Sequence, residues 1–294
     1  MNTPTPSASA SPAQGEFDPG AELHAPELYQ PANLAHNVAT LADIGPDEIA
    51  FYHEHGYLAV RQAFSPGEID AALAGLVDLI MGRNPAFTGI MFEAAARDLL
   101  PKLGPEERQD AVRKIYYFVN YDARLKALSH HPRLLSAVQM LLGTPSVEMF
   151  QDMGLIKPPR LGREKPWHQD HAYFDYPLGT PIVGVWIAFD EATIANGCMQ
   201  LLPGRHREGP IAHFKRRDWQ ICDNVTLGTR SVAAPLAPGG LLFFDGLLPH
   251  GTPHNASLHR RRAVQFHYAP AGITKTTEAE RLQIFGGEGR GMKC

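Results

Sequence analysis

The stretch that decides the fold reads Val147-Glu-Met-Phe-Gln-Asp-Met-Gly-Leu155. Its alternate residues, from Val147 to Leu155, share one face if the backbone is extended, because the side chains of a strand repeat every two residues. The hydrophobic period therefore changes near residue 145 from the helical value to that of a strand. Further strand-like runs, separated by Pro and Gly, follow at 182–189, 198–202, 240–245 and 262–268. The second half of the chain is predicted to be mostly β.

The first half has helical patterns instead. Helices are expected at residues 46–56, 65–80, 106–118 and 132–142, with a short strand at 57–60. Ser65-Pro-Gly-Glu68 is a capping box, which gives the second of these helices the clearest start. Gly143 stands where a left-handed residue usually ends a helix. Helices grouped before strands favour an α+β or jelly-roll arrangement over an alternating, doubly wound sheet.

Composition and charge narrow the class of protein. The chain has 294 residues, of which 44% are hydrophobic and 20% charged, as is ordinary for a globular protein. No stretch approaches the roughly 18 uninterrupted apolar residues that a membrane helix needs, so no membrane association is expected. The first 60 residues hold eight acidic side chains and no Lys or Arg. Because the net charge of the whole chain is −4, the remaining residues have a net charge of +4. That excess suits a small anionic substrate and is too diffuse to indicate nucleic-acid binding.

The N-terminal residues differ in composition from the rest. Residues 1–36 are rich in Pro, Ser and Ala and acidic, so they are predicted to form a flexible tail, able to settle onto the body near residues 28–34, ahead of a single domain at 37–294. An N-terminus without Lys or Arg, and without an apolar segment, is unlike a transit or secretory peptide. A cytoplasmic location is therefore expected.

The densest group of chemically active residues is Pro166-Trp-His-Gln-Asp170. On a strand, His168 and Asp170 point to the same side because they are two residues apart. A second histidine would complete the triad of two imidazoles and one carboxylate that holds Fe(II) and leaves positions open for substrate and dioxygen. His250 is the expected third ligand, because it follows the apolar run 241–244 and a turn at Asp245-Gly246.

These motifs together resemble the phytanoyl-CoA dioxygenase family of Fe(II)/2-oxoglutarate-dependent oxygenases. The resemblance covers roughly residues 46–270 and rests on Trp167-His-Gln-Asp170, Gly184-Val-Trp-Ile-Ala188, Asn196-Gly-Cys198 with Leu202-Pro-Gly-Arg-His206, His250-Gly-Thr252, and Arg261. One departure is Arg205, where the family usually has Ser. The family fold is a double-stranded β-helix, also called a jelly roll or cupin-like fold, with an N-terminal layer of supporting α-helices.

The resemblance implies a role for each matching residue. His168, Asp170 and His250 match the iron ligands, and Arg261 matches the arginine that pairs with the distal carboxylate of 2-oxoglutarate. Thr252 matches a hydroxyl donor to the same carboxylate, and Trp186, Lys114 and Met153 fall where relatives have further co-substrate contacts. With Fe(II), 2-oxoglutarate and O2, the chain would hydroxylate a small-molecule substrate and release succinate and CO2. The carboxylate of Asp170 favours a hydroxylase or desaturase over a halogenase.

Several residues have a second interpretation. His254 and His259 compete with His250, while His171 and His206 suit roles outside the ligand set, and His267 suits either the pocket wall or the core. Lys114 could equally be an exposed helix charge. Segments 157–166 and 207–232 are candidate lids over an anionic substrate, or solvated loops.

Two other functions compete with the oxygenase. A non-enzymatic cupin-like module that binds a metal or small molecule would not need His168, Asp170, His250 and Arg261 together. A zinc hydrolase with the same three ligands leaves Arg261 unexplained. Acyl-CoA, amino-acid-derived and natural-product substrates all remain compatible with the resemblance, and no oligomeric state is predicted.

The last strand allows a choice among three adjacent arginines. Arg261 shares a face with Ala263, Gln265 and His267, whereas Arg262 shares the opposite face with Val264, Phe266 and Tyr268. The second face is apolar and suits packing under the helical layer. The first is polar and suits the interior of a barrel that holds a charged co-substrate, so Arg261 is predicted to meet the carboxylate.

Overall fold

The computed structural model describes residues 15–104 and 106–286. Its larger sheet has nine strands in the order β1-β5-β6-β7-β16-β9-β14-β4-β3. These strands are β1 (Glu16–Phe17), β3 (Asn37–Val38), β4 (Tyr57–Val60), β5 (Ile90–Phe92), β6 (Val112–Tyr116), β7 (Val147–Lys157), β9 (Val183–Ala188), β14 (Leu241–Asp245) and β16 (Arg261–Pro270). The β-rich second half predicted from the alternating pattern is therefore confirmed.

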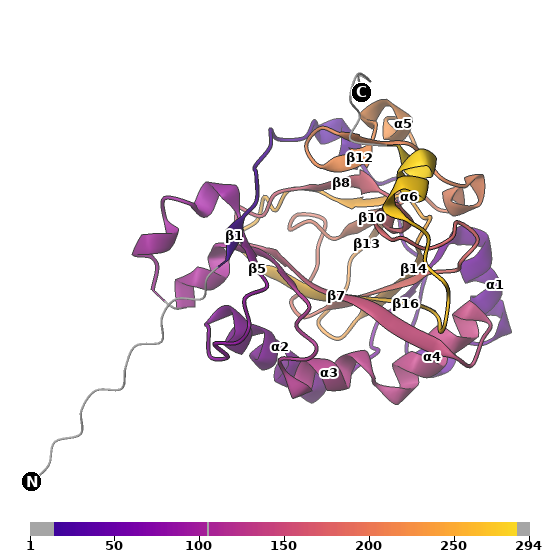
Figure 1. Ribbon diagram of the computed structural model, residues 1–294, viewed down its shortest axis with the longest axis horizontal. Coiled ribbons are helices and arrows are strands. Elements are labelled where there is room, and N and C mark those ends of the chain that lie inside the picture. Colours follow the sequence, from indigo (N-terminus) through magenta and orange to yellow (C-terminus); the bar gives the residue numbers. More distant parts are fainter. Residues whose placement is uncertain (1–14, 105, 287–294) are drawn as a thin grey trace, which may run out of the picture.

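A smaller sheet of five strands lies over one face of the larger one (Figure 1). Its order is β2-β13-β10-β15-β8, from β2 (Asn33–Leu34), β8 (Lys165–His168), β10 (Met199–Leu201), β13 (Val232–Ala234) and β15 (His250–Thr252). Trp186 and Phe244 of the larger sheet form one buried cluster with Met199 and Leu201 of the smaller sheet. Two facing, largely antiparallel sheets make the jelly-roll architecture that the sequence predicted. A hairpin of β11 (His213–Lys215) and β12 (Trp219–Ile221) lies beside them.

Helices cover the other face of the larger sheet. They include α1 (Pro46–His55), α2 (Pro66–Ile80), α3 (Ala123–Ser129) and α4 (Pro132–Leu142), and Figure 1 shows α2, α3 and α4 beneath β7 and β16. The Ser65 capping box and the left-handed Gly143 are present as predicted. Two short helices, α5 (Asp223–Thr226) and α6 (Glu278–Phe285), follow later. Within the described ranges, no helix has both the length and the apolar character needed to cross a membrane.

Short 3-10 helices connect many of these elements. They are η1 (Pro26–Tyr29), η2 (Leu41–Asp43), η3 (Ala94–Ala96), η4 (Leu100–Lys102), η5 (Glu106–Asp110), η6 (Asp170–Tyr173) and η7 (Arg205–Glu208). The helix predicted at 106–118 is wrong, because only η5 is helical and β6 follows it. Val112 and Ile115 are buried in the core, and β6 pairs with β5 and β7. These long-range pairings outweigh the local helical pattern.

Residues 15–36 differ from the flexible tail predicted for residues 1–36, of which 1–14 lie outside the described residues. β1 pairs with β5 and β2 pairs with β13, so this segment joins both sheets. The Tyr29 ring stacks on Trp167 with centroids 5.5 Å apart, and its hydroxyl donates to Glu164 at 2.7 Å. The burial of Leu28 and Tyr29 agrees with the expected settling near residues 28–34, whereas the pairing of β1 and β2 depends on distant parts of the chain and was not predicted.

Candidate metal centre and co-substrate pocket

His168, Asp170 and His250 come together between β8 and β15. His168 ends β8 and is the register partner of His250 at the start of β15, while Asp170 begins η6 just beyond the strand. Asp170 Oδ1 lies 3.1 Å from His168 Nε2 and 3.6 Å from His250 Nε2. All three side chains are buried, and one ligand atom from each lies within 4.8 Å of the others. This arrangement could hold a single metal ion.

The backbone fixes which nitrogen of each histidine faces this point. His168 Nδ1 lies 2.7 Å from the Pro166 carbonyl oxygen, and His250 Nδ1 lies 2.9 Å from that of Leu248. Each Nδ1 must therefore carry the proton, which leaves the Nε2 lone pair free for a metal. Burial lowers the pKa of His168 to about 3 and also lowers that of His250, so both rings are neutral at neutral pH. Two neutral imidazoles and one carboxylate fit a divalent iron ion.

Asp170 is held on its second oxygen by two residues of β16. Gln265 Nε2 donates to Oδ2 at 2.9 Å, and His267 Nε2 lies 2.7 Å from the same atom. Burial alone would raise the pKa of Asp170. The imidazoles of His250 and His267 outweigh burial and hold this pKa well below its usual range. The alternation along β16 predicted that His267 and Gln265 share the Arg261 face, but it gave Gln265 no role.

Arg261 is buried beside this group, at the start of β16. Its guanidinium carbon lies 5.2 Å from the centre of the Trp186 ring, and Nη1 lies 3.5 Å from the Leu155 carbonyl oxygen. Its Nε has no hydrogen-bond partner among the described residues. Burial lowers the pKa of Arg261 to about 10, so the side chain remains charged at neutral pH. Because no ion pair of Arg261 is seen among the described residues, this buried guanidinium could bind an anion.

The other two arginines point elsewhere. Arg262 Nη2 lies 2.8 Å from Asp190 Oδ1, and Arg260 Nη2 donates to Asp110 Oδ2 at 2.9 Å. Val264, Phe266 and Tyr268, on the Arg262 face, belong to the core under the helices. The structure therefore has the predicted alternation, with Arg261 on the face toward the cavity and Arg262 on the opposite face.

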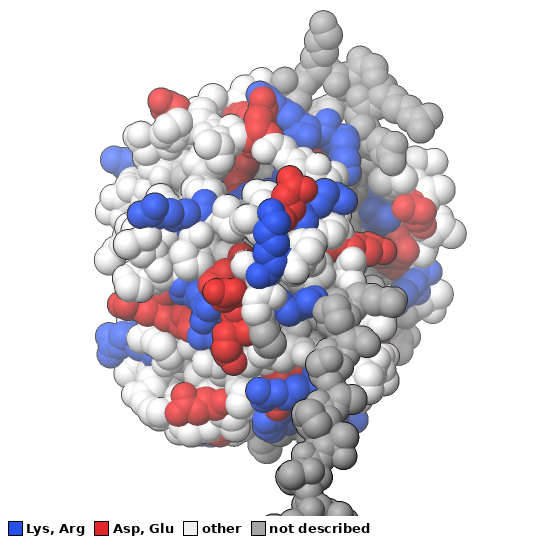
Figure 2. Space-filling view, turned by 90° about the vertical axis from the view of Figure 1, so that its left-hand side faces the viewer, with Lys and Arg blue, Asp and Glu red and all other residues white. Residues whose placement is uncertain are grey.

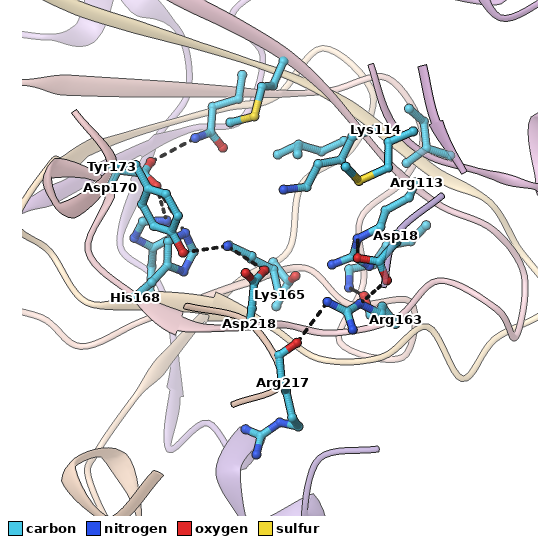
Figure 3. A pocket seen from close by; sticks show the side chains of 18 of the residues that line it. Asp18, Arg113, Lys114, Arg163, Lys165, His168, Asp170, Tyr173, Arg217 and Asp218 are labelled. Carbon is cyan, nitrogen blue, oxygen red and sulfur yellow. Dashed lines mark hydrogen bonds and ion pairs between the residues drawn. The ribbon is translucent and has the colours of Figure 1, made fainter. Parts of the chain in front are cut away.

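One cavity of about 530 Å³ contains the histidines, Asp170 and Arg261. The remaining predicted site residues, Thr252, Trp186, Met153 and Lys114, all line it as well. Lys114 comes from β6 rather than from a helix, and Figure 3 shows it reaching into the cavity from the side opposite His168 and Asp170. Burial, and after it the charges of Lys165 and Arg113, lower the pKa of Lys114 to about 7.

Lys165, one of the basic residues of the candidate lid at 157–166, lines the cavity and pairs with Asp218, a partner that the sequence did not indicate. Lys165 Nζ lies 2.8 Å from Asp218 Oδ2 and donates to the Tyr173 hydroxyl at 2.9 Å (Figure 3). Lys165 belongs to the segment 157–166 and Asp218 to the segment 207–232, both predicted as candidate lids. Parts of both segments line the cavity. Since 53 residues separate Lys165 from Asp218, no local signal could have paired them.

Asp18, Arg113 and Arg163 lie at the end of the cavity away from His168 and Asp170, called the outer end below (Figure 3). Asp18 Oδ2 lies 3.0 Å from Arg163 Nε, and Asp18 Oδ1 lies 3.6 Å from Arg113 Nε. On the face of the molecule that carries β1 and β5, Figure 2 shows Lys and Arg interleaved with Asp and Glu. The visible described part of this face therefore has charges of both signs rather than one basic patch.

Neither the two competitors of His250, His254 and His259, nor His171 and His206 belong to the metal group. His171 is buried, and its Nε2 lies 3.3 Å from the Tyr176 carbonyl oxygen. His206 contacts the His53 carbonyl oxygen, which is the loop bonding expected of a turn residue. Over residues 15–104 and 106–286, the one group of this kind consists of His168, Asp170 and His250.

Comparisons with known proteins agree with this geometry. Residues 52–263 match the phytanoyl-CoA dioxygenase family. A probable phytanoyl-CoA dioxygenase of Caenorhabditis elegans is 25% identical over 252 residues, which cover 81% of this chain and 79% of that protein. The phytanoyl-CoA dioxygenase domain-containing protein 1 of Rattus norvegicus is 30% identical over 172 residues, or 55% of this chain and 58% of the relative.

Solved structures give the same result for the fold. EvdO2 from Micromonospora carbonacea var. aurantiaca is 26% identical, with a TM-score of 0.62 over 82% of this chain and 96% of EvdO2. SnoK, a non-heme alpha ketoglutarate dependent carbocyclase from nogalamycin biosynthesis, is 20% identical, with a TM-score of 0.62 over 82% of this chain and 90% of SnoK. This chain belongs to the phytanoyl-CoA dioxygenase family of Fe(II)- and 2-oxoglutarate-dependent oxygenases.

Proposed function

We propose that this protein is an Fe(II)- and 2-oxoglutarate-dependent hydroxylase of a small-molecule substrate, with His168, Asp170 and His250 as its iron ligands. The observation that carries the proposal is the buried Arg261 guanidinium in the same cavity as these three residues. Neither a metal-binding module nor a zinc hydrolase would require the positive charge of Arg261 at this position. A dicarboxylate that binds the metal at one end needs an anion receptor of this kind for the other end.

The donor set fits the proposed metal. The Nε2 atoms of both histidines are free of protons, and Asp170 directs Oδ1 toward them. When bound, Fe(II) and 2-oxoglutarate supply the oxidising chemistry, in which O2 is consumed and 2-oxoglutarate becomes succinate and CO2.

The residues around the metal group would bind and orient the co-substrate. Arg261 can grip a carboxylate with two parallel hydrogen bonds, and Thr252, which is buried at the same cavity, can donate a third from its hydroxyl. Trp186 forms a wall under the guanidinium. Met153 contributes an apolar surface, and Lys114 adds a second positive charge. Together they would keep water from the reacting end of 2-oxoglutarate.

We propose that the substrate is a small anion, because basic residues outnumber acidic ones in the cavity lining. The side chains of Lys215 and Arg216, in segment 207–232, and of Arg163, in segment 157–166, line the cavity. These two segments are the proposed lids. An anion that enters between them would meet positive charge before it reaches the metal group.

The test is anaerobic reconstitution with Fe(II), and separately with Zn(II), followed by 2-oxoglutarate, air and a panel of small anionic compounds. We expect succinate from the Fe(II) protein alone, with release stimulated by the true substrate and a product that has gained one oxygen atom. An Fe(II)-loaded protein that forms no succinate would contradict the oxygenase. A product that is cyclised or epimerised, without added oxygen, would contradict hydroxylation only.

A further inference from the structure

The strand that carries Arg261 also carries two contacts to Asp170. Gln265 and His267 follow Arg261 on the same face of β16. Gln265 Nε2 donates to Asp170 Oδ2 at 2.9 Å, and His267 Nε2 lies 2.7 Å from that same oxygen. Both side chains are buried, with 4% and 0% exposed surface. Two donors therefore converge on one of the two carboxylate oxygens.

The other oxygen is directed to the metal group. Asp170 Oδ1 lies 3.1 Å from His168 Nε2 and 3.6 Å from His250 Nε2. We infer that Gln265 and His267 are positioning residues that hold Asp170 so that Oδ1 alone is offered to a metal ion. This inference rests on the proposed function, because it concerns the same metal group.

The reason lies in the number of positions around the ion. Two histidines and one carboxylate oxygen would hold the ion and leave positions open for a 2-oxo acid and O2. If both oxygens of Asp170 bound the ion, one of those positions would be lost. A carboxylate with one oxygen engaged by two N–H donors cannot turn that oxygen toward the metal without breaking both bonds.

The His267 ring makes its polar contacts through Nε2, which lies 2.7 Å from Asp170 Oδ2 and 3.2 Å from Gln265 Nε2. Nε2 must carry a proton to donate to Asp170, and Nδ1 has no hydrogen-bond partner among the described residues. Phe174 packs against the ring with centroids 4.7 Å apart, and Phe150 and Phe244 lie farther out, at 5.9 and 6.2 Å. Apolar packing thus fixes the ring with Nε2 directed at Asp170.

The experiment compares Co(II) binding by wild type, His267→Phe, Gln265→Leu and the double variant. His267→Phe keeps an aromatic ring but removes the donor, and His267→Gln restores an N–H donor. The matched control is His171→Phe, which changes a buried histidine that contacts the Tyr176 carbonyl oxygen instead. Co(II) affinity and the visible Co(II) spectrum report on the metal group, and thermal unfolding of the metal-free proteins reports on the fold.

We expect His267→Phe to weaken Co(II) binding by about 10- to 100-fold, the usual range for loss of a residue that orients a metal ligand. The spectrum should change with it, His267→Gln should recover most of the affinity, and His171→Phe should match wild type. If His267→Phe and Gln265→Leu lower only the unfolding temperature and keep the wild-type Co(II) affinity and spectrum, the two residues are structural and the inference is wrong. A wild-type protein that binds no Co(II) would instead contradict the proposed metal group itself.

Discussion

The metal group and the outer end of the cavity are built in different ways. At the metal group, His168 and His250 are oriented by carbonyl oxygens only two residues earlier in the chain. At the outer end, Asp18 contacts Arg113 and Arg163, which come from segments far apart in sequence. The first region holds neutral rings around one carboxylate, and the second is a network of ion pairs.

Because of this difference, we expect the metal group to determine the reaction and the outer end to affect how the substrate enters. The geometry of the metal group depends on local backbone, on one strand pair, β8 with β15, and on the contacts of Gln265 and His267 with Asp170, so changes at the outer end should leave its metal affinity intact. The outer end depends on the N-terminal segment meeting β6 and the segment before β8. Changes there should alter stability and entry of the substrate rather than the reaction.

The largest expected effect is that of Asp170→Ala. Loss of the carboxylate removes one ligand and leaves the donors of Gln265 and His267 without their partner. We expect Fe(II) binding to weaken and succinate release to fall to background, measured with Fe(II) and ascorbate supplied. Thermal unfolding checks that the variant is folded, and undiminished turnover by a folded variant would refute the ligand assignment.

Arg261→Ala should have the second largest effect, and this effect should be on 2-oxoglutarate binding. Loss of one partner of a buried charge pair costs about 3 to 5 kcal/mol, which corresponds to roughly two to four decades of affinity. We expect the 2-oxoglutarate concentration for half-maximal rate to rise at least ~100-fold, a value scaled from that cost. Kinetic titration of 2-oxoglutarate measures the change.

Arg260→Ala and Arg262→Ala are the controls for this comparison. Their guanidinium groups pair with Asp110 and Asp190, so their loss should lower the unfolding temperature and change the 2-oxoglutarate requirement by less than ~10-fold. A larger 2-oxoglutarate defect in either control than in Arg261→Ala would mean that Arg261 is not the carboxylate receptor.

Lys114 should give a smaller, pH-dependent effect. Its pKa of about 7, against an ordinary 10.5, means that the side chain loses its positive charge as the pH rises through neutrality. If Lys114 binds an anion, the 2-oxoglutarate KM should rise roughly tenfold between about pH 6 and pH 8, in step with the fall in the protonated fraction. Lys114→Arg should keep a low KM across this range, and Lys114→Met a high one. A Lys114→Met profile that still follows the wild-type slope would assign the titration to another group.

Asp18→Asn should have the smallest effect on the chemistry. It removes the negative charge between Arg113 and Arg163, so the unfolding temperature should fall. The Co(II) affinity should be unchanged, because the contacts that orient His168 and His250 are local. Metal titration of the variant checks this, and a clear loss of Co(II) affinity would mean that the two regions are coupled.

The sequence was most informative where structure follows from local pattern. The alternation along residues 261–268 selected Arg261 over its neighbours, since the face of a strand depends only on its period. The capping box at Ser65 placed the start of α2 for the same reason. Gln265 could not be recognised, because its partner Asp170 is 95 residues away.

The local sequence pattern did not predict the structure of segments that are held by residues far away in the sequence. Residues 112–116 have a helix-compatible composition but lie in β6, because β5 and β7 offer hydrogen bonds on both sides. Tyr29 lies in the Pro-rich, acidic segment predicted to be a flexible tail, within residues 28–34 where that tail was expected to settle onto the body. It is buried because Trp167 and Glu164 provide a ring and an acceptor.

The central claim is that one cavity binds Fe(II) and 2-oxoglutarate together for oxidation. The most direct measurement is an anaerobic titration of the Fe(II)-loaded protein with 2-oxoglutarate, followed by visible absorption, and then by succinate after air is admitted. We expect a new absorption that requires both Fe(II) and 2-oxoglutarate, saturates at one equivalent per chain, and is lost as succinate forms. A protein that binds Fe(II) but gives neither this absorption nor succinate would contradict the account.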